Sequence, residues 1–184
     1  MTLKIVIAPQ SFKGSISALE AARAIERGVL TAEPDAQTVL APVADGGDGT
    51  LDALVEGTGG QYIRSIVTGP LGQPVEATWG VMGDGRTAVI EMAQASGLAI
   101  VPPRRRNPRI TTTRGTGEII KEALDKGFDQ IIVGLGGSAT NDGGVGIAQA
   151  LGVRFTDKEG EDLPVGGASL ALLEAIDLKE IDTR

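Results

Sequence analysis

The chain has 184 residues and a formal net charge of -7, with 41% hydrophobic and 22% charged residues, a composition typical of a globular protein. Cysteine and histidine are both absent, which excludes disulfides, thiolate metal sites and histidine acid–base chemistry. The acidic charge argues against a nucleic-acid partner, which requires a basic face. No signal peptide or membrane-spanning run is visible, so we expect a cytoplasmic protein without a membrane partner.

The first sixty residues alternate between strand and helix patterns. Residues 3–8 form a short apolar run rich in β-branched side chains, which predicts a buried strand. Ser17 and Glu20 have the spacing of a capping box at the start of a helix. A second strand is predicted at 38–41, and a second helix around 51–55. The β-α-β-α order indicates a parallel sheet covered by helices.

From residue 61 onward the pattern changes to short strands. We predict three of them, at 62–67, 75–81 and 87–92, separated by turns that contain glycine. Connections that short allow only antiparallel pairing. Residues 61–109 are therefore interpreted as an antiparallel β excursion or inserted module.

An α/β pattern then returns, with a helix predicted at 118–124 and a strand at 130–134. We accordingly assign residues 1–60 and 110–152 to one Rossmann-like α/β domain. Residues 153–184 begin a further segment that stops without an evident ending.

Four polar or glycine-rich loops follow predicted strands, and glycine is abundant, at 27 residues. In an open parallel sheet such loops gather at the carboxyl edge, where ligands bind. The loops are 11–15, 44–50, 111–118 and 134–144.

The first three loops each carry groups that suit an anion or a metal. Ser11 and Lys13 place a hydroxyl and an ammonium before a helix start, which favours anions. Asp45 and Asp48, with glycines between them, suit a hard cation such as Mg²⁺, although either could instead cap the next helix. Arg114 follows several hydroxyls and fits contact with a phosphate or carboxylate.

The fourth loop is the most informative. Its backbone N–H groups, at Gly136, Gly137, Ser138 and Gly143, can form a nest for phosphate oxygens. Polar side chains stand among its glycines: Ser138, Thr140, Asn141 and Asp142.

The same loop also fits a rival chemistry. Gly134-x-Gly136-x-x-Ala139 follows a strand and matches the dinucleotide fingerprint, with Asp157 about twenty residues further on, so an NAD(P)-dependent oxidoreductase is an alternative. Against it, residues 140–144 delay the next helix. A Gly-Lys-Ser/Thr sequence is absent, which excludes a P-loop kinase but not kinases of other folds.

Taken together, these segments resemble the glycerate kinase family. One segment alone would be weak evidence, but they occur in the family's order and spacing over the whole chain. The matching stretches are 5–9 with 11–15, 44–47, 67–72, 90–93 with 95–98, 115–118 and 136–144.

The resemblance implies an α/β fold: a Rossmann-like parallel sheet with helices on both faces plus an inserted, partly antiparallel α/β module. It implies phosphoryl transfer from ATP, with Mg²⁺, to a hydroxyl of glycerate, giving phosphoglycerate. Family chains run about as long again, so the fold is expected to be incomplete relative to the family. An inactive fragment that self-associates into a homodimer through its unfinished sheet stays open as an alternative.

Residue roles follow from the loops and the resemblance. We expect Asp45 and Asp48 to bind Mg²⁺, and Lys13 to neutralise phosphate or the glycerate carboxylate. Asp142 is the predicted catalytic base, with Asp45 next. The expected substrate contacts are Ser11, Lys13, Arg114, Ser138, Thr140 and Asn141, and the expected nucleotide contacts are Gly136, Gly137, Ser138 and Gly143. The family usually has aspartate where this chain has Gln10, and glutamate where it has Asp48.

Overall fold

The computed structural model describes residues 2–12 and 15–184. The strands are β1 (Lys4–Ile7), β2 (Gln37–Leu40), β3 (Gln61–Thr68), β4 (Pro74–Val81), β5 (Thr87–Glu91), β6 (Gln130–Gly134), β7 (Arg154–Thr156) and β8 (Ala175–Asp177). The α-helices are α1 (Ala18–Ala32), α2 (Thr50–Thr58), α3 (Ala93–Ser96), α4 (Arg114–Asp125) and α5 (Val145–Ala150). Short 3-10 helices span Leu98–Ile100, Pro103–Arg105 and Gly167–Leu172. The chain is thus a mixed α/β protein, as the sequence predicts.

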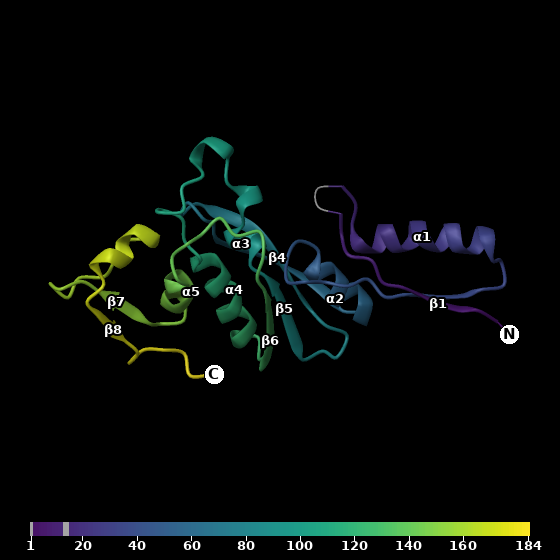
Figure 1. Cartoon of the computed structure of the whole chain (residues 1–184). Helices are drawn as coiled ribbons and strands as arrows, with labels where there is room; N and C mark the ends of the chain where they lie inside the picture. The colour runs from purple at the N-terminus through teal and green to yellow at the C-terminus, as the bar shows by residue number, and fades with distance from the viewer. Residues whose placement is uncertain (1, 13–14) are drawn as a thin grey trace.

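The first unit consists of β1, α1 and β2, and it projects away from the rest of the molecule (Figure 1). Its two strands pair in parallel, with Val6 opposite Val39. The capping box at the start of α1 is confirmed: Ser17 Oγ accepts from the Glu20 N–H at 3.2 Å, and Glu20 Oε2 accepts from the Ser17 N–H at 2.8 Å. The prediction of a buried strand at 3–8 is wrong, because only Ile7 of β1 is buried. Val6 on β1 and Val39 on β2 are 61% and 40% exposed.

The central sheet has the strand order β3-β4-β5-β6. Antiparallel pairing of β3 with β4 and of β4 with β5 confirms the predicted meander. The sequence grouped residues 130–134 with residues 1–60, whereas β6 pairs in parallel with β5. Every residue of β5 is buried, so this strand needs a partner on both edges. The segment between β5 and β6, which includes α4, is long enough for the crossover that parallel strands require.

Helices cover both faces of this sheet. On one face, α4 packs Ile119 against the fully buried Trp79 and Ile90. The Trp79 indole N–H donates to Ser65 Oγ at 3.0 Å, which satisfies its polar group inside the core. On the other face, α2 packs Leu51 and its apolar neighbours against β5. The loop 135–137, which follows β6, therefore begins at a sheet that is packed on both faces.

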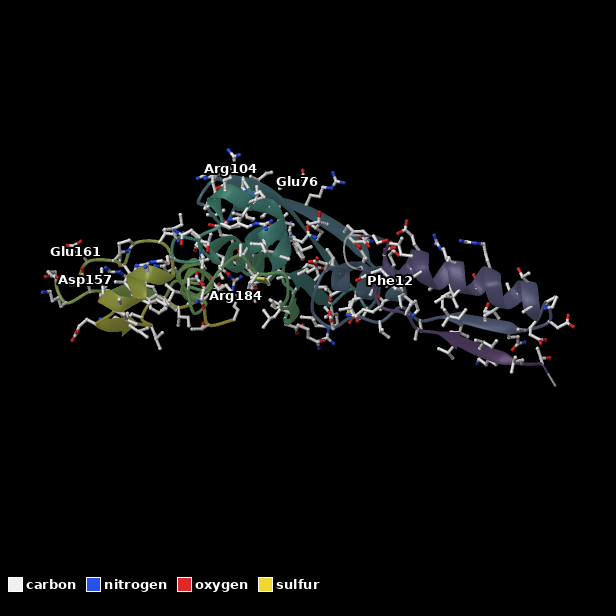
Figure 2. The ribbon with its side chains drawn as sticks, turned by 45° about the horizontal axis from the view of Figure 1, so that its top comes forward. Phe12, Glu76, Arg104, Asp157, Glu161 and Arg184 are labelled. Atoms are coloured by element: carbon white, nitrogen blue, oxygen red, sulfur yellow. The ribbon has the colours of Figure 1, made fainter. Side chains whose placement is uncertain are left out.

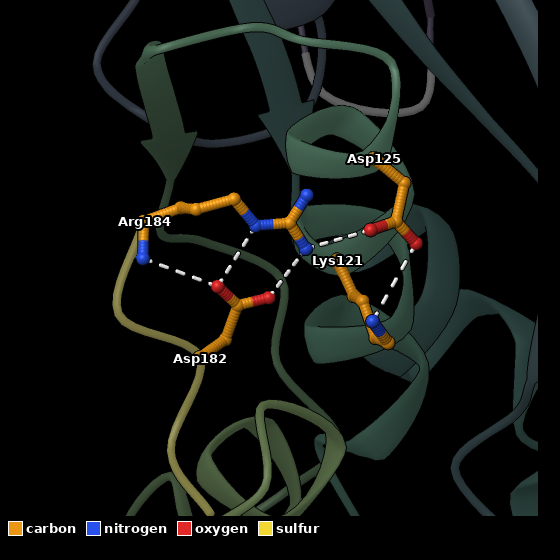
Figure 3. Close-up of polar contacts among 4 residues, drawn as sticks. All are labelled: Lys121, Asp125, Asp182 and Arg184. Atoms are coloured by element: carbon orange, nitrogen blue, oxygen red, sulfur yellow. Dashed lines mark hydrogen bonds and ion pairs between the residues drawn. The ribbon is translucent and has the colours of Figure 1, made fainter.

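The last part of the chain forms a small separate sheet in which β7 pairs with β8. Asp157 and Glu161 lie at its outer end, far from Phe12 (Figure 2). The guanidinium of Arg184 contacts Asp125 of α4 and Asp182, each at 2.6 Å (Figure 3). This ion-pair cluster ties the C-terminal segment to α4. Over the described ranges, the helices are too short or too polar for any to traverse a lipid bilayer.

Candidate active site

Loops from three strands meet around one cavity of about 400 Å³. The loops follow β1, β2 and β6, so three of the four predicted loops converge at the carboxyl ends of strands. The remaining one, 111–118, follows a 3-10 helix and does not line the cavity. The lining residues are Gln10, Ser11, Asp45, Gly47, Asp48, Leu135, Gly136 and Gly137. Five of the predicted site residues are therefore brought together: Ser11, Asp45, Asp48, Gly136 and Gly137.

The two glycine-rich loops at the cavity pack backbone against backbone. A Cβ atom on Gly136 would lie 2.5 Å from the Cα atom of Gly47, a distance that no side chain tolerates. A Cβ on Gly137 would lie 3.0 Å from Asp48 Oδ1, and Gly137 has a φ of +61°. The absence of side chains here brings the acidic loop 44–49 and the loop 135–137 into direct contact.

The acidic loop holds Asp45 as a carboxylate. Asp45 Oδ1 accepts a hydrogen bond from the Gly47 N–H at 3.0 Å. This bond, followed by one from the side chain of Gln10, lowers the pKa of Asp45 below its ordinary value. Asp45 is therefore negatively charged at neutral pH. Ser11 Oγ donates to the backbone carbonyl of Asp48 at 3.0 Å, which links the loop after β1 to the acidic loop.

Neither aspartate caps the following helix, so that alternative from the sequence is wrong. The N-cap of α2 is Gly49, in a left-handed conformation and without a side-chain hydrogen bond. Instead, Glu91 Oε2 accepts from the Leu51 N–H of the first helical turn at 3.1 Å. Burial raises the pKa of Glu91, and the bond from Leu51 partly opposes that rise. Glu91 falls within the predicted strand 87–92, and no sequence signal links it to the acidic loop.

The donor set of the cavity fits Mg²⁺. Magnesium is usually held by one or two carboxylates, together with waters and the phosphates of the substrate. Asp45 and Asp48 supply two carboxylates, and Gln10 and Ser11 add an amide and a hydroxyl. Within the part of the chain that the structure describes, no three acidic, histidine or cysteine side chains gather as a metal cluster. The residues therefore suit a cation shared with a phosphate ligand.

The predicted base Asp142 does not line the cavity. Its side chain is 3% exposed, and its oxygens accept from the Thr113 N–H at 2.8 Å, the Gly144 N–H at 3.1 Å and the Gly146 N–H at 3.3 Å. These bonds join the start of α4 to the start of α5. Because the bonds occupy both oxygens of this buried carboxylate, the geometry disfavours Asp142 as a base.

The rest of the fourth loop runs beside the cavity without lining it. Ser138 Oγ donates to the sulfur atom of Met92 at 3.1 Å, and so faces the end of β5. Thr140, Asn141 and Gly143 lie further along, in the segment that leads to α5. The structure therefore brings the beginning of this loop, and not its polar end, to the cavity.

Arg114, which the sequence predicts to contact a phosphate or carboxylate, has a partner within the chain. The Arg114 guanidinium forms an ion pair with Glu118, at 3.0 Å, one turn along α4. Arg114 does not line the cavity. Lys13 lies outside the described residues, so its predicted contact with an anion stays a prediction.

The geometry contradicts the dinucleotide fingerprint. The fingerprint requires a helix to open within its glycines, whereas α5 begins at Val145, well beyond Ala139. Asp157, the expected ribose-binding acid, accepts instead from the N–H groups of Glu159 and Glu161 in its own turn. That turn lies at the outer end of the C-terminal sheet (Figure 2).

Comparison with known proteins identifies relatives over nearly the whole chain. Glycerate kinase of Bacillus subtilis is 59% identical over 182 residues, which are 99% of this chain and 48% of that protein. Glycerate 2-kinase of Escherichia coli is 54% identical over 182 residues, which are again 99% of this chain and 48% of that protein. The crystal structure of a glycerate kinase 2 from Salmonella typhimurium superposes with a TM-score of 0.89 at 54% identity, covering 100% of this chain and 50% of the other.

The chain thus spans about half the length of the curated relatives that it matches. The model of the glycerate kinase family matches residues 5–184. The order of the loops along the chain, the cavity that they form and the match to the family model all indicate the same family. The chain belongs to the glycerate kinase family.

Proposed function

We propose that this chain supplies the metal- and phosphate-binding part of a glycerate kinase, which transfers the γ-phosphoryl group of ATP to a hydroxyl of glycerate. The observation that carries the proposal is the cavity in which two carboxylates, Asp45 and Asp48, face a glycine-rich loop. Family membership and the names of the relatives support the choice of glycerate and ATP.

Phosphoryl transfer depends mainly on positioning and on neutralising charge. Asp45 and Asp48 would hold Mg²⁺, which would shield the negative charge of the phosphates. Backbone N–H groups of the loop 135–137 would bind phosphate oxygens. As the glycerate oxygen bonds to phosphorus and the bond to the ADP oxygen breaks, a carboxylate accepts the hydroxyl proton. Asp45 is the residue that we assign to this step, because it is a carboxylate at the cavity, whereas Asp142, the other candidate from the sequence, does not line it.

Calorimetric titration of the 184-residue chain with glycerate, with MgATP and with NADH tests this proposal. We expect heat of binding from glycerate or MgATP and none from NADH. Asp45→Asn should weaken that binding by at least about tenfold, whereas Asp157→Asn, a change of the same chemistry at the outer end of the molecule, should preserve it. Binding of NADH that ATP does not displace would contradict the kinase assignment.

A homodimer is a second proposal, carried by the open first sheet. The strands β1 and β2 pair only with each other among the described strands, and both Val6 and Val39 are exposed. Open edges and apolar faces favour association. Light scattering should show a mass that rises with concentration, and Val39→Lys should abolish the rise. Ile66→Lys, at a 70% exposed site on β3, should not.

A cytoplasmic location also stays a prediction from the sequence.

A further inference from the structure

Glu91 is a buried carboxylate that lies behind the acidic loop. It is the last residue of β5, its side chain is 3% exposed, and it does not line the cavity. Its Oε2 accepts from the Leu51 N–H at 3.1 Å, and the Gly49 N–H also interacts with the carboxylate. Glu91 therefore connects the central sheet to the junction between the acidic loop and α2.

This contact replaces a local helix cap. The first N–H groups of a helix have no partner within the helix, and a Ser, Thr, Asp or Asn at the N-cap usually satisfies one of them. Gly49 occupies the N-cap here and has no side chain to do so. Burying a glutamate is unfavourable unless hydrogen bonds compensate. A cap from a residue forty positions away anchors the loop as well as the helix.

The hydrogen bond from the Leu51 N–H to Glu91 holds the backbone next to Asp48. Gly49 directly follows Asp48, and Ser11 Oγ binds the Asp48 carbonyl from the loop after β1 at 3.0 Å. On the other side of the loop, Thr50 Oγ1 accepts from the Gly46 N–H at 3.0 Å. The backbone that carries both cavity aspartates is thus fixed at each end, and Glu91 is its link to the sheet.

We propose that Glu91 is a positioning residue, which fixes residues 48–51 so that Asp48 presents its carboxylate to a divalent cation. The inference rests on the proposed function, in which Asp45 and Asp48 bind the metal. Groups that orient metal ligands typically change metal affinity by about 10- to 100-fold when they are removed. A purely structural role would change stability and leave metal affinity as it is.

The test measures Mn²⁺ binding to the 184-residue chain by electron paramagnetic resonance. Glu91→Ala should weaken binding by about tenfold or more. Glu91→Gln keeps an oxygen that can accept from Leu51, and should retain most of the affinity. Val89→Ala is the matched control, because Val89 lies on the same strand and belongs to the apolar cluster that contains Leu51. That variant should lose stability and keep its Mn²⁺ affinity.

Wild-type affinity in Glu91→Ala would overturn the proposal, and so would Glu91→Gln if it bound as weakly as Glu91→Ala. If Glu91→Ala does not fold, Glu91→Asp is measured instead, because a side chain one methylene shorter should lengthen the 3.1 Å hydrogen bond to the Leu51 N–H. Weakened binding in Glu91→Asp supports the proposal, and unchanged binding overturns it. A failure of the proposed metal site gives a different result: the wild-type chain would bind no Mn²⁺, or Asp48→Asn would bind Mn²⁺ as tightly as wild type. Either result would also refute the role proposed for Glu91.

Discussion

Asp142 and Thr113 stand 29 positions apart and share three hydrogen bonds, two of them from the Thr113 hydroxyl. Asp142 Oδ2 accepts from the Thr113 N–H at 2.8 Å and from the Thr113 hydroxyl at 2.9 Å. The same Thr113 oxygen accepts from the Ile147 N–H at 3.1 Å. The starts of α4 and α5 therefore depend on one buried polar pair.

Replacing Asp142 with asparagine should lower stability. The amide nitrogen of the new side chain would face backbone N–H donors, and an unsatisfied buried polar group costs about 1–3 kcal/mol. Urea unfolding should show the loss, and Asp129→Asn, at an exposed site, should leave the free energy of unfolding near the wild-type value. A stable Asp142→Asn variant that has lost only turnover, in an active full-length relative, would restore Asp142 as the base.

Removing either cavity aspartate should affect ligand binding more than folding. Asp45→Asn and Asp48→Asn should each weaken binding of MgATP by at least about tenfold, or roughly 1.4 kcal/mol. Asp45 is exposed at the cavity, so the unfolding midpoint should change little. Calorimetric titration at several Mg²⁺ concentrations measures the effect, and partial recovery at high Mg²⁺ would identify a metal ligand. Equal loss at every Mg²⁺ concentration would contradict that role.

Adding a methyl group at Gly136 should separate the two loops. Its Cβ would lie 2.5 Å from the Gly47 Cα, so the backbone must shift, which typically costs about 1–3 kcal/mol. Gly57→Ala is the control, because nothing lies within 4 Å of its Cβ position and it stands inside α2. That change should raise stability by about 0.5–1 kcal/mol. Thermal unfolding compares the two, and a neutral Gly136→Ala would refute the packing argument.

Removing the guanidinium of Arg184 should change how stability depends on pH. Its hydrogen bonds hold the pKa values of Asp125 and Asp182 below their ordinary range. A lowered pKa means a contribution to stability that is present above about pH 4 and is lost as pH falls through the lower folded value.

Arg184→Ala should therefore unfold at a lower temperature than wild type at pH 7, with the difference narrowing in acid. High salt should also narrow the difference, because the side chains of Arg184 and Asp125 are 48% and 52% exposed. Carboxyl NMR titration gives the direct check: both aspartates should return toward their ordinary pKa in the variant. Unchanged titration of Asp182 would show that the cluster does not form in solution.

Local patterns predicted the elements and the convergence of the loops. The capping box of Ser17 and Glu20 involves neighbours in sequence, so spacing alone revealed it. The turns of the meander are equally local. Asp45 and Asp48 could be assigned to a ligand site because each follows a strand, and strand ends share an edge.

Contacts between distant residues could not be predicted in the same way. Nothing in the spacing shows that Asp142 meets Thr113, so a carboxylate in a glycine-rich loop looked catalytic. Glu91 ends an apolar strand, and its role depends on α2 lying against β5. The pairing of β5 with β6 likewise joins residues that are over forty positions apart, and the pattern within each strand does not show it.

The open faces of β1 and β2 have a consequence for dynamics. Amide protons of residues 4–7 should exchange with solvent faster than those of the buried strand β5, since local opening is easiest where few apolar contacts close over the backbone. Gln10 and Asp45 lie in the loops that follow these two strands. Five of the eight residues that line the cavity therefore follow the strands of this unit, and a ligand that bridges them to the loop 135–137 would slow hydrogen exchange throughout the unit.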